Sequence, residues 1–393
     1  MTTVLRRLEG PLALLLALAL WAGACLFAGA AAPLGERAAL QIGGAPAGVP
    51  AAREMAAAEA RTEHPLAFTL WRQEDGQTVE SPALGRERTV SVLTLWGESA
   101  LLLPDARPSL APAAGNGCLI DRTTALSLFG DARAEGQKVR WNGRDYTVRG
   151  VFDAPEATLA VEADPASEVL FDRVTLDLSG EENPRGRAEE FAMRHGLPGE
   201  RIVQYGGLAA LARFFCLLPA LAAACSLAVR FFGRARVRRD WPVQRALLWI
   251  AAVAAAAAVL WLAGVRPAVP QDLIPTRWSD FSFWETLFTE RRAEWTDYLW
   301  MKKERPDVLL LTALLKAATC SLAALLLAAR PALRRPAAGP RAFAFLLAAC
   351  LCGSFAGVAL VGGGELLARD LPMLWLTAPL WLAACRAVEK IPD

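Results

Sequence analysis

Six apolar stretches alternate with polar segments along the 393 residues of the chain. A helix needs about 20 predominantly apolar residues to cross the hydrocarbon core of a bilayer. The stretches cover residues 11–33, 207–229, 246–265, 308–329, 342–361 and 371–385, and the last is the shortest. The pattern predicts a multi-pass α-helical membrane protein, with a cytoplasmic tip and first span in residues 1–35 and a five-helix region in residues 206–393.

Arginines gather in the two segments that follow the second and fourth apolar stretches. They are Arg230, Arg234, Arg236, Arg238, Arg239 and Arg245 in the first segment, and Arg330, Arg334, Arg335 and Arg341 in the second. Cytoplasmic loops of membrane proteins carry an excess of Lys and Arg, so both segments are expected in the cytoplasm. The chain is then expected in the cell membrane with both termini in the cytoplasm. Residues 36–205 and 266–307 lie on the extracytoplasmic side.

The first apolar stretch has two interpretations. A basic start, an apolar run and small residues at 28–33 are also typical of a cleavable signal peptide, and the residues before Cys25 resemble a lipid-attachment site. The run is longer than the roughly 7–15 residues of a signal-peptide core. We therefore favour an uncleaved membrane anchor.

The extracytoplasmic residues 36–205 show short strand and helix patterns. Helices are expected over residues 51–61 and from the Asn183-Pro184 cap to His195, and strands over residues 38–42, 66–71, 89–95, 173–178 and 201–204. Asp75-Gly76 is a turn signal between two of these strands. Without an insertion over residues 103–155, the order predicts a split ferredoxin-like α+β unit.

The insertion is expected to be rich in β-structure. Residues 118–120 form a short strand, residues 123–129 a helix stopped by Gly130, and residues 138–148 a hairpin. Asn142-Gly143 lies at the centre of that hairpin and favours a type I′ turn, because both positions require a positive φ.

These residues resemble a known domain. Three segments carry the resemblance: GCLIDRTTALSLFG at 117–130, EGQKV at 135–139 and WNGRDYTVRGV at 141–151. They are similar to the periplasmic core domain of MacB/FtsX-type ABC permeases, in which a Leu-Phe-Gly helix end precedes Gly-Gln-x-Val and an Asn-Gly hairpin. The resemblance implies a domain that relays motion between the outside and the membrane, with Gly130 and Gly136 freeing the backbone and Gly150 allowing a bend.

The chain also departs from that family. Six spans are expected here, whereas the family usually has four, and the segment after the second span lacks the Glu-hydrophobic-Gly coupling pattern. We therefore consider two functions. The first is a permease-like subunit coupled to an ABC ATPase, with Arg234, Arg236, Arg238, Arg239 and Arg245 as docking residues. The second is a non-transporting membrane sensor or scaffold.

Composition and motifs indicate no chemistry of the chain's own. Its net charge of +2 does not favour a nucleic-acid partner. No phosphate-binding Gly-x-x-x-x-Gly-Lys-[Ser/Thr] loop is present. His64 and His195 have no metal-spaced neighbours and are expected in surface loops, and Cys118 is alone in the polar domain. We expect a non-enzyme without cofactor or metal, whose partners are membrane lipid, an ABC ATPase and other subunits in a homo- or hetero-oligomer.

Three features of the apolar and external segments remain. Lys316 lies inside the fourth span, where it either makes a polar contact within the bundle or snorkels. Gly353 and Gly357 permit close helix approach, by default within the chain. Residues 266–307 are rich in aromatics and are expected to include an interfacial helix. Its tryptophans are Trp278, Trp284, Trp295 and Trp300.

Overall fold

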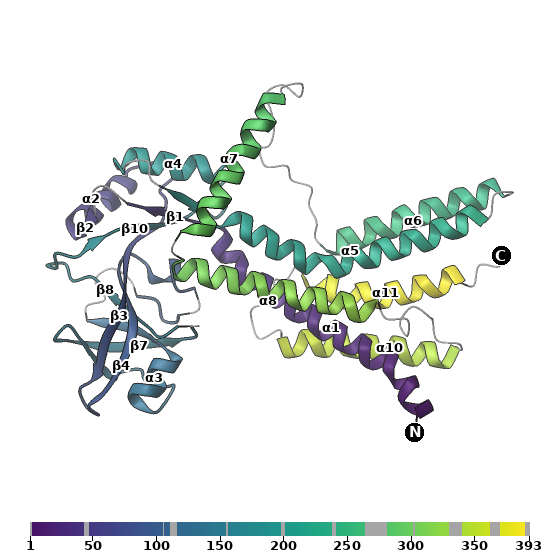
Figure 1. Cartoon of the computed structure of the whole chain (residues 1–393), viewed down its shortest axis with the longest axis horizontal. Helices are drawn as coiled ribbons and strands as arrows, with labels where there is room; N and C mark the ends of the chain where they lie inside the picture. Colours follow the sequence, from purple (N-terminus) through teal and green to yellow (C-terminus); the bar gives the residue numbers. More distant parts are fainter. Residues whose placement is uncertain are drawn as a thin grey trace. The chain divides into compact units, whose positions relative to one another are not determined.

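The structure is a computed structural model that describes residues 2–42, 47–104, 106–110, 116–154, 156–197, 201–237, 241–263, 281–301, 303–329, 340–361 and 370–389. The chain divides into two units (Figure 1). Unit 1 comprises Met1–Leu34, Gly207–Pro270 and Asp307–Asp393, and it is helical. Unit 2 comprises Gly35–Gly206 and Gln271–Pro306, and it contains the β-sheets.

Unit 1 is built from long apolar helices. They are α1 (Thr2–Gly35), α5 (Gly206–Val237), α6 (Pro242–Leu262), α8 (Arg305–Ala328), α10 (Pro340–Val361) and α11 (Leu371–Glu389). Within the described residues, α1, α5, α6 and α8 are long and apolar enough to cross a membrane. Predicted spans five and six correspond to the shorter apolar stretches Phe343–Ala356 and Leu371–Ala387.

Helix α5 is hydrogen-bonded to three other helices of unit 1. The indole of Trp21 in α1 donates a hydrogen bond to the Cys216 carbonyl (2.9 Å), and the Ser321 hydroxyl in α8 donates to the Phe215 carbonyl (2.6 Å). Trp381 of α11 donates to the Ser226 hydroxyl (2.5 Å). Polar side chains that bond across apolar helices fix which faces meet, so these three bonds hold α1, α8 and α11 around α5.

Helices α1 and α10 approach closely at Gly353, as its spacing with Gly357 predicted. A Cβ atom at Gly353 would lie 2.3 Å from Cδ2 of Leu15 in α1. A larger residue here would require the Leu15 side chain to move, so the close approach lies within the chain.

Unit 2 contains four antiparallel strands covered by two helices. They are β1 (Arg37–Gln41), β3 (Phe68–Ser81), β10 (Arg173–Asp177) and β11 (Ile202–Gln204), with α2 (Val49–Glu59) and α4 (Pro184–Arg194). The strand order is β11-β1-β10-β3, and every neighbouring pair is antiparallel. Helix α2 connects β1 to β3, and α4 connects β10 to β11, so each connection passes over one intervening strand.

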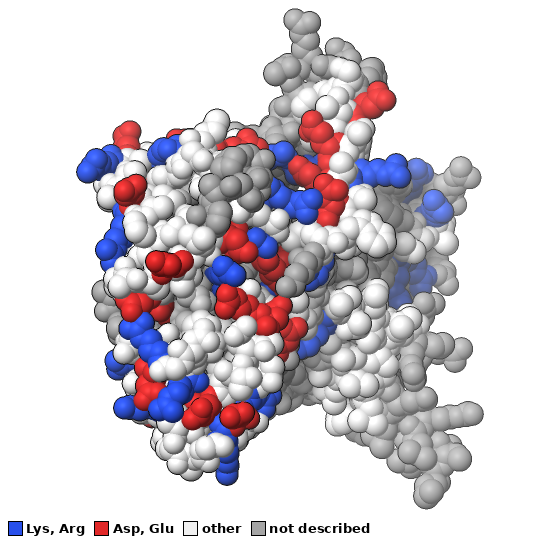
Figure 2. Space-filling model, turned by 60° about the vertical axis from the view of Figure 1, so that its left-hand side comes forward, with Lys and Arg blue, Asp and Glu red and all other residues white. Residues whose placement is uncertain are grey.

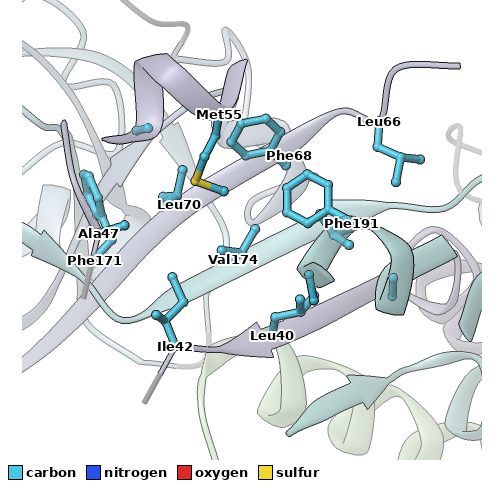
Figure 3. Close-up of a cluster of buried hydrophobic side chains, with 14 of the residues drawn as sticks. Leu40, Ile42, Ala47, Met55, Leu66, Phe68, Leu70, Phe171, Val174 and Phe191 are labelled. Carbon is cyan, nitrogen blue, oxygen red and sulfur yellow. The ribbon is translucent and has the colours of Figure 1, made fainter. Parts of the chain in front are cut away.

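The two helices pack on one face of these strands. Met55 of α2 and Phe191 of α4 are buried with Phe68, Leu70 and Val174 of the sheet. Figure 3 shows Met55 reaching toward Leu70, and the rings of Phe68 and Phe191 lie 5.3 Å apart. Buried aliphatic and aromatic side chains each contribute about 1.5–3 kcal/mol relative to exposure, and this cluster holds the helices to the sheet.

Five more strands continue the same sheet and, together with β3, form a closed ring. They are β4 (Arg86–Trp96), β5 (Gly117–Asp121), β6 (Lys138–Trp141), β7 (Arg144–Phe152) and β8 (Thr158–Glu162). Their order from β3 is β3-β4-β8-β5-β7-β6, and β6 pairs back with β3 where Glu80 faces Arg140. The ring surrounds a core that includes Val92, Cys118 and Val148, and α3 (Arg122–Phe129) packs against it. Short elements η1 (Ser99–Leu101), β2 (Ala47–Gly48) and β9 (Leu170–Phe171) complete the unit.

Two elements with a clear local sequence signal occur as predicted. Strands β6 and β7 form the predicted hairpin, in which Asn142 has φ 49° and Gly143 has φ 72°, as a type I′ turn requires. Helix α4 begins with the predicted cap, since the Asn183 side chain accepts a 3.0 Å hydrogen bond from the Gly186 amide.

The turn predicted at Asp75-Gly76 is wrong. Strand β3 continues through these residues to Ser81, and its pairing with β4 shifts register between Glu74 and Gln77. The chain reverses later, where the Gly85 amide bonds to the Ser81 carbonyl (2.9 Å). A β-bulge uses the same residue types as a turn, so Asp-Gly did not distinguish the two.

Strand β8 lies outside the predicted insertion of residues 103–155. It pairs in parallel with β4 and antiparallel with β5, and all five of its residues are buried. Leu159 and Val161 pack into one buried cluster and Ala160 into another, so both faces of the strand are covered.

Candidate functional site

Two strands of unit 2 are continuous with two long apolar helices. Helix α1 ends at Gly35 and β1 begins at Arg37, while β11 ends at Gln204 and α5 begins at Gly206. Strands β1 and β11 are adjacent and antiparallel, with Ala38 opposite Gln204. The end of α1 and the start of α5 therefore leave the same end of one strand pair.

Hydrogen bonds join the residues at this junction to other parts of unit 2. The Leu178 amide donates to the Glu36 carbonyl (2.8 Å), and the Tyr205 amide donates to the Arg37 carbonyl (3.4 Å). The Arg37 guanidinium donates to the Leu101 carbonyl (2.6 Å). The residues Glu36 and Tyr205, which lie between helix and strand, are thus hydrogen-bonded within unit 2.

Helix α7 (Phe281–Trp300) belongs to unit 2, and acidic residues in and after it pair with arginines of the sheet and α4. The pairs are Arg185–Glu294 at 2.7 Å, Arg201–Asp297 at 4.0 Å and Arg173–Glu304. We call these three ion pairs the clamp. Elsewhere, acidic and basic side chains are interspersed over the surface shown in Figure 2, so neither sign dominates that face.

The Arg173–Glu304 pair is the least exposed part of the clamp. The Arg173 Nε atom lies 2.9 Å from both carboxylate oxygens of Glu304, and Nη2 also bonds Oε1. Burial alone would lower the pKa of the Arg173 guanidinium, but the hydrogen bonds and the charge of Glu304 outweigh burial and raise that pKa. A fork of several charge-assisted bonds fixes direction as well as distance. The clamp therefore orients the chain immediately before α8.

Arg305, the first residue of α8, is seated on the sheet. It is buried, its Nη1 donates to the Thr158 hydroxyl (2.7 Å), and its guanidinium lies 4.8 Å from the centroid of the Phe152 ring. The Thr158 amide in turn donates to the Asp121 carboxylate (2.8 Å), which also caps α3. The residues at which α1 ends and at which α5 and α8 begin thus belong to unit 2.

The sequence-predicted docking arginines lie around the connection between α5 and α6. Arg234 and Arg236 are in the last turn of α5, where a positive charge suits the helix dipole, and Arg245 is exposed in α6. Arg238 and Arg239 lie outside the described residues.

Lys316 lies on an exposed side of α8. Its Nζ atom is 5.4 Å from the centroid of the Phe27 ring in α1. An ammonium over an aromatic face is attracted by the ring quadrupole, which supports a polar contact within unit 1. Unchanged folding and activity in Lys316→Leu would dispose of this hypothesis.

Three of the four tryptophans predicted to be interfacial lie in α7. Trp284, Trp295 and Trp300 are in the helix, whereas Trp278 lies outside the described residues. Trp295 is 44% exposed and Trp300 86% exposed, and Phe288 is 69% exposed. Large aromatic side chains this exposed point to an apolar partner or surface.

His195 corrects the prediction that both histidines are surface residues. His64 is exposed, but the side chain of His195 is only 4% exposed, and its Nε2 atom lies 2.8 Å from Oε1 of Glu59. Glu59 of α2 is itself buried and accepts hydrogen bonds from the Leu66 amide and Arg194. Burial alone would raise the pKa of Glu59, but the bonds from Leu66, His195 and Arg194 outweigh it and lower that pKa. The carboxylate therefore ties α2 to α4.

Gly150 follows a register irregularity in the pairing of β7 with β5, and it also lies close to a second backbone segment. A Cβ atom there would lie 2.6 Å from the carbonyl oxygen of Arg107. The position therefore needs glycine because another backbone segment passes too close for any side chain.

Two of the solved structures to which the chain is similar are extracytoplasmic domains. One is the crystal structure of the periplasmic region of MacB from Actinobacillus actinomycetemcomitans, with 12% identity, a TM-score of 0.34, and coverage of 44% of this chain and 90% of that one. The other is the extracellular domain of the noncanonic ABC-type transporter YknZ from Gram-positive bacteria, with 10% identity, a TM-score of 0.32, and coverage of 42% and 97%. No family model and no curated protein matches the chain. Likenesses at this level establish no shared function.

Proposed function

We propose that the chain is a permease-like membrane subunit of an ABC-type transporter or mechanotransmission complex, and that it couples its extracytoplasmic domain to a cytoplasmic ATPase. The junction between β1 and β11 carries this proposal. Two paired strands continue in the sequence directly into two long apolar helices, and we infer that movement of these helices acts on the strand pair.

The proposal includes a topology. Both termini and the arginine-rich segments are cytoplasmic, and residues 36–205 are extracytoplasmic, following the positive-inside rule. Within the outer domain, the four strands β11-β1-β10-β3 with α2 and α4 are proposed to be the split ferredoxin-like unit. Their order and their two crossover helices support it. The strands from β4 to β8 then form the β-rich insertion.

The proposed ATPase docks at Arg234, Arg236, Arg238, Arg239 and Arg245. One observation favours the alternative of a membrane sensor or scaffold without an ATPase. Helix α5 ends at Val237 and α6 begins at Pro242, so the connection has no room for a separate coupling helix. Any docking surface must then be made by the helix ends themselves.

Purification from membranes in a mild detergent, followed by mass spectrometry of stoichiometric partners, tests the proposal. We expect an ATP-binding cassette subunit with the wild-type chain and its loss with Arg234→Glu/Arg236→Glu. Arg53→Glu is the matched control, because Arg53 is exposed on α2 in unit 2. Reproducible absence of an ATPase from the wild-type preparation would leave the sensor or scaffold.

Membrane lipid is the second proposed partner, through α7. Trp284, Phe288, Trp295 and Leu299 follow each other at intervals of four, seven and four residues, which places them on one stripe of a helix. Acidic residues that belong to the clamp, such as Glu294, lie on another side. Tryptophan side chains favour the headgroup layer of a bilayer. Brominated lipids should quench less fluorescence in Trp295→Phe than in the wild type, and equal quenching in the two would exclude this contact.

A further inference from the structure

Three helices of unit 1 bring two cysteines and one aspartate together in its interior. Cys25 is in α1, Cys216 is in α5, and Asp370 immediately precedes α11. All three side chains are buried, and the two sulfur atoms are 3.2 Å apart. The potential ligand atoms of the three residues all lie within 4.8 Å of one another.

Asp370 supplies an independent indication of a ligand. Its side chain is fully buried, and Oδ1 accepts a hydrogen bond from Nη1 of Arg213. Its Oδ2 atom has no hydrogen-bond partner among the described residues. A buried carboxylate oxygen without a donor is costly, because it has lost its hydration without replacement. A carboxylate oxygen of the same residue lies within 4.8 Å of both sulfurs, so Asp370 is placed to act as a metal ligand.

We propose that Cys25, Cys216 and Asp370 bind a thiophilic divalent metal ion of the Zn²⁺ type. Thiolate sulfur and carboxylate oxygen are ordinary ligands of such an ion. The ion forms one bond to each sulfur and releases the two thiol protons to solvent, and no electron is transferred. This site is independent of the proposed coupling function.

Charge balance favours a divalent ion. Without metal, two neutral thiols accompany the Asp370 carboxylate and the Arg213 guanidinium, and the cluster has zero net charge. With metal, two thiolates and one carboxylate carry three negative charges, which the ion and Arg213 neutralise. Both states are therefore electrically neutral in an apolar interior, where a net charge costs several kcal/mol. A monovalent or trivalent ion would leave one charge uncompensated.

The two sulfur atoms need only a small displacement to bind one metal ion. At metal–sulfur distances of about 2.3 Å in a tetrahedral site, two sulfur ligands lie about 3.8 Å apart. The sulfurs of Cys25 and Cys216 must then separate by about 0.6 Å from their present 3.2 Å. Surrounding bonds hold the ligands in place, since Trp21 donates to the Cys216 carbonyl (2.9 Å) and Arg213 donates to the Ala263 carbonyl (3.0 Å). Three protein ligands leave the fourth tetrahedral position open.

The test is Co²⁺ binding to the full chain, purified in detergent without an affinity tag and kept reduced. We expect one Co²⁺ per chain with a thiolate-to-cobalt charge-transfer band, displaced by Zn²⁺, and loss of that band in Cys25→Ser and Cys216→Ser. Asp370→Asn should weaken binding. Cys350→Ser is the matched control, because Cys350 is a buried cysteine of α10 outside the cluster, and it should bind as the wild type does.

A second measurement needs no substitution. Zn²⁺ should protect Cys25 and Cys216 of the wild-type chain from alkylation, read by mass spectrometry, while leaving Cys225 on the exposed side of α5 reactive. Failure of the reduced wild type to bind Co²⁺, binding that survives in the double cysteine variant, or an absence of Zn²⁺ protection would each overturn the proposal. So would a Cys25–Cys216 disulfide in the chain isolated from cells with thiols blocked.

Discussion

The clamp predicts that Glu304→Gln releases α7 from the sheet of unit 2. The change keeps the side-chain size but removes the charge that pairs with Arg173. The two side chains are 12% and 19% exposed, so the pair is largely but not fully desolvated. Breaking a fully buried pair costs about 3–5 kcal/mol, and an exposed pair contributes about 0–1 kcal/mol. We therefore expect about 2–3 kcal/mol for this intermediate case.

That free energy corresponds to a measurable change in hydrogen exchange. At 1.36 kcal/mol per factor of ten, the released state becomes about 30- to 160-fold more populated. A helix of about 20 residues is marginal by itself in water, so released α7 exchanges its amide protons faster. Exchange measured by mass spectrometry on the full chain in lipid nanodiscs should rise across Phe281–Trp300 and stay unchanged in α3.

Glu294→Gln is the internal control. Its pair with Arg185 is about 40% exposed on both sides, and exposed pairs contribute less than about 1 kcal/mol, so exchange in α7 should rise less than about sixfold. Equal effects of the two variants would refute the reasoning that burial sets the strength of the clamp. An unchanged α7 in Glu304→Gln would refute the clamp itself.

Three further predictions concern unit 2. Gly150→Ala should lower the stability of the full chain by about 1–3 kcal/mol in chemical denaturation, because its Cβ would meet the Arg107 carbonyl. Gly233→Ala is the control and should not lower the stability, because a Cβ there would meet nothing within 4 Å. Similar losses of stability in the two variants would contradict the packing argument. Burial raises the pKa of Cys118 to about 12, so its thiol should resist alkylation at pH 8 until the chain is unfolded, and labelling in the folded chain would be the opposing result. The pKa of Glu59 is lower in the folded chain than its ordinary value of 4.5, so its ionised form stabilises the fold above that pH, and this stabilisation is lost as pH falls through the folded pKa. Glu59→Gln should flatten that acid limb of the stability curve, and an unchanged pH dependence would show that Glu59 does not set it.

The elements that could be predicted are those whose cause is local in sequence. The Asn142-Gly143 turn and the Asn183 cap depend on a few neighbouring residues, and both occur in the structure. The apolar stretches identified the helices of unit 1 for the same reason, since the length of an apolar run alone determines whether a helix can cross a bilayer.

What could not be predicted depends on residues far apart in the chain. Strand β8 is defined by its neighbours β4 and β5, and nothing in its five residues identifies those partners. His195 is buried because Glu59, 136 residues earlier, accepts its hydrogen bond. The clamp and the Cys25–Cys216 contact likewise join residues more than 90 positions apart. Single cysteines in apolar runs carry no signal of one another before the helices are packed.

We propose that displacement of α1 and α5 reaches unit 2 through the paired strands β1 and β11. Hydrogen exchange of the chain purified together with the proposed ATPase, with and without a non-hydrolysable ATP analogue, is the most direct test. We expect a nucleotide-dependent change in exchange at Arg37–Gln41 and Ile202–Gln204, with α3 unchanged. Identical exchange in both strands while the nucleotide is bound would contradict it.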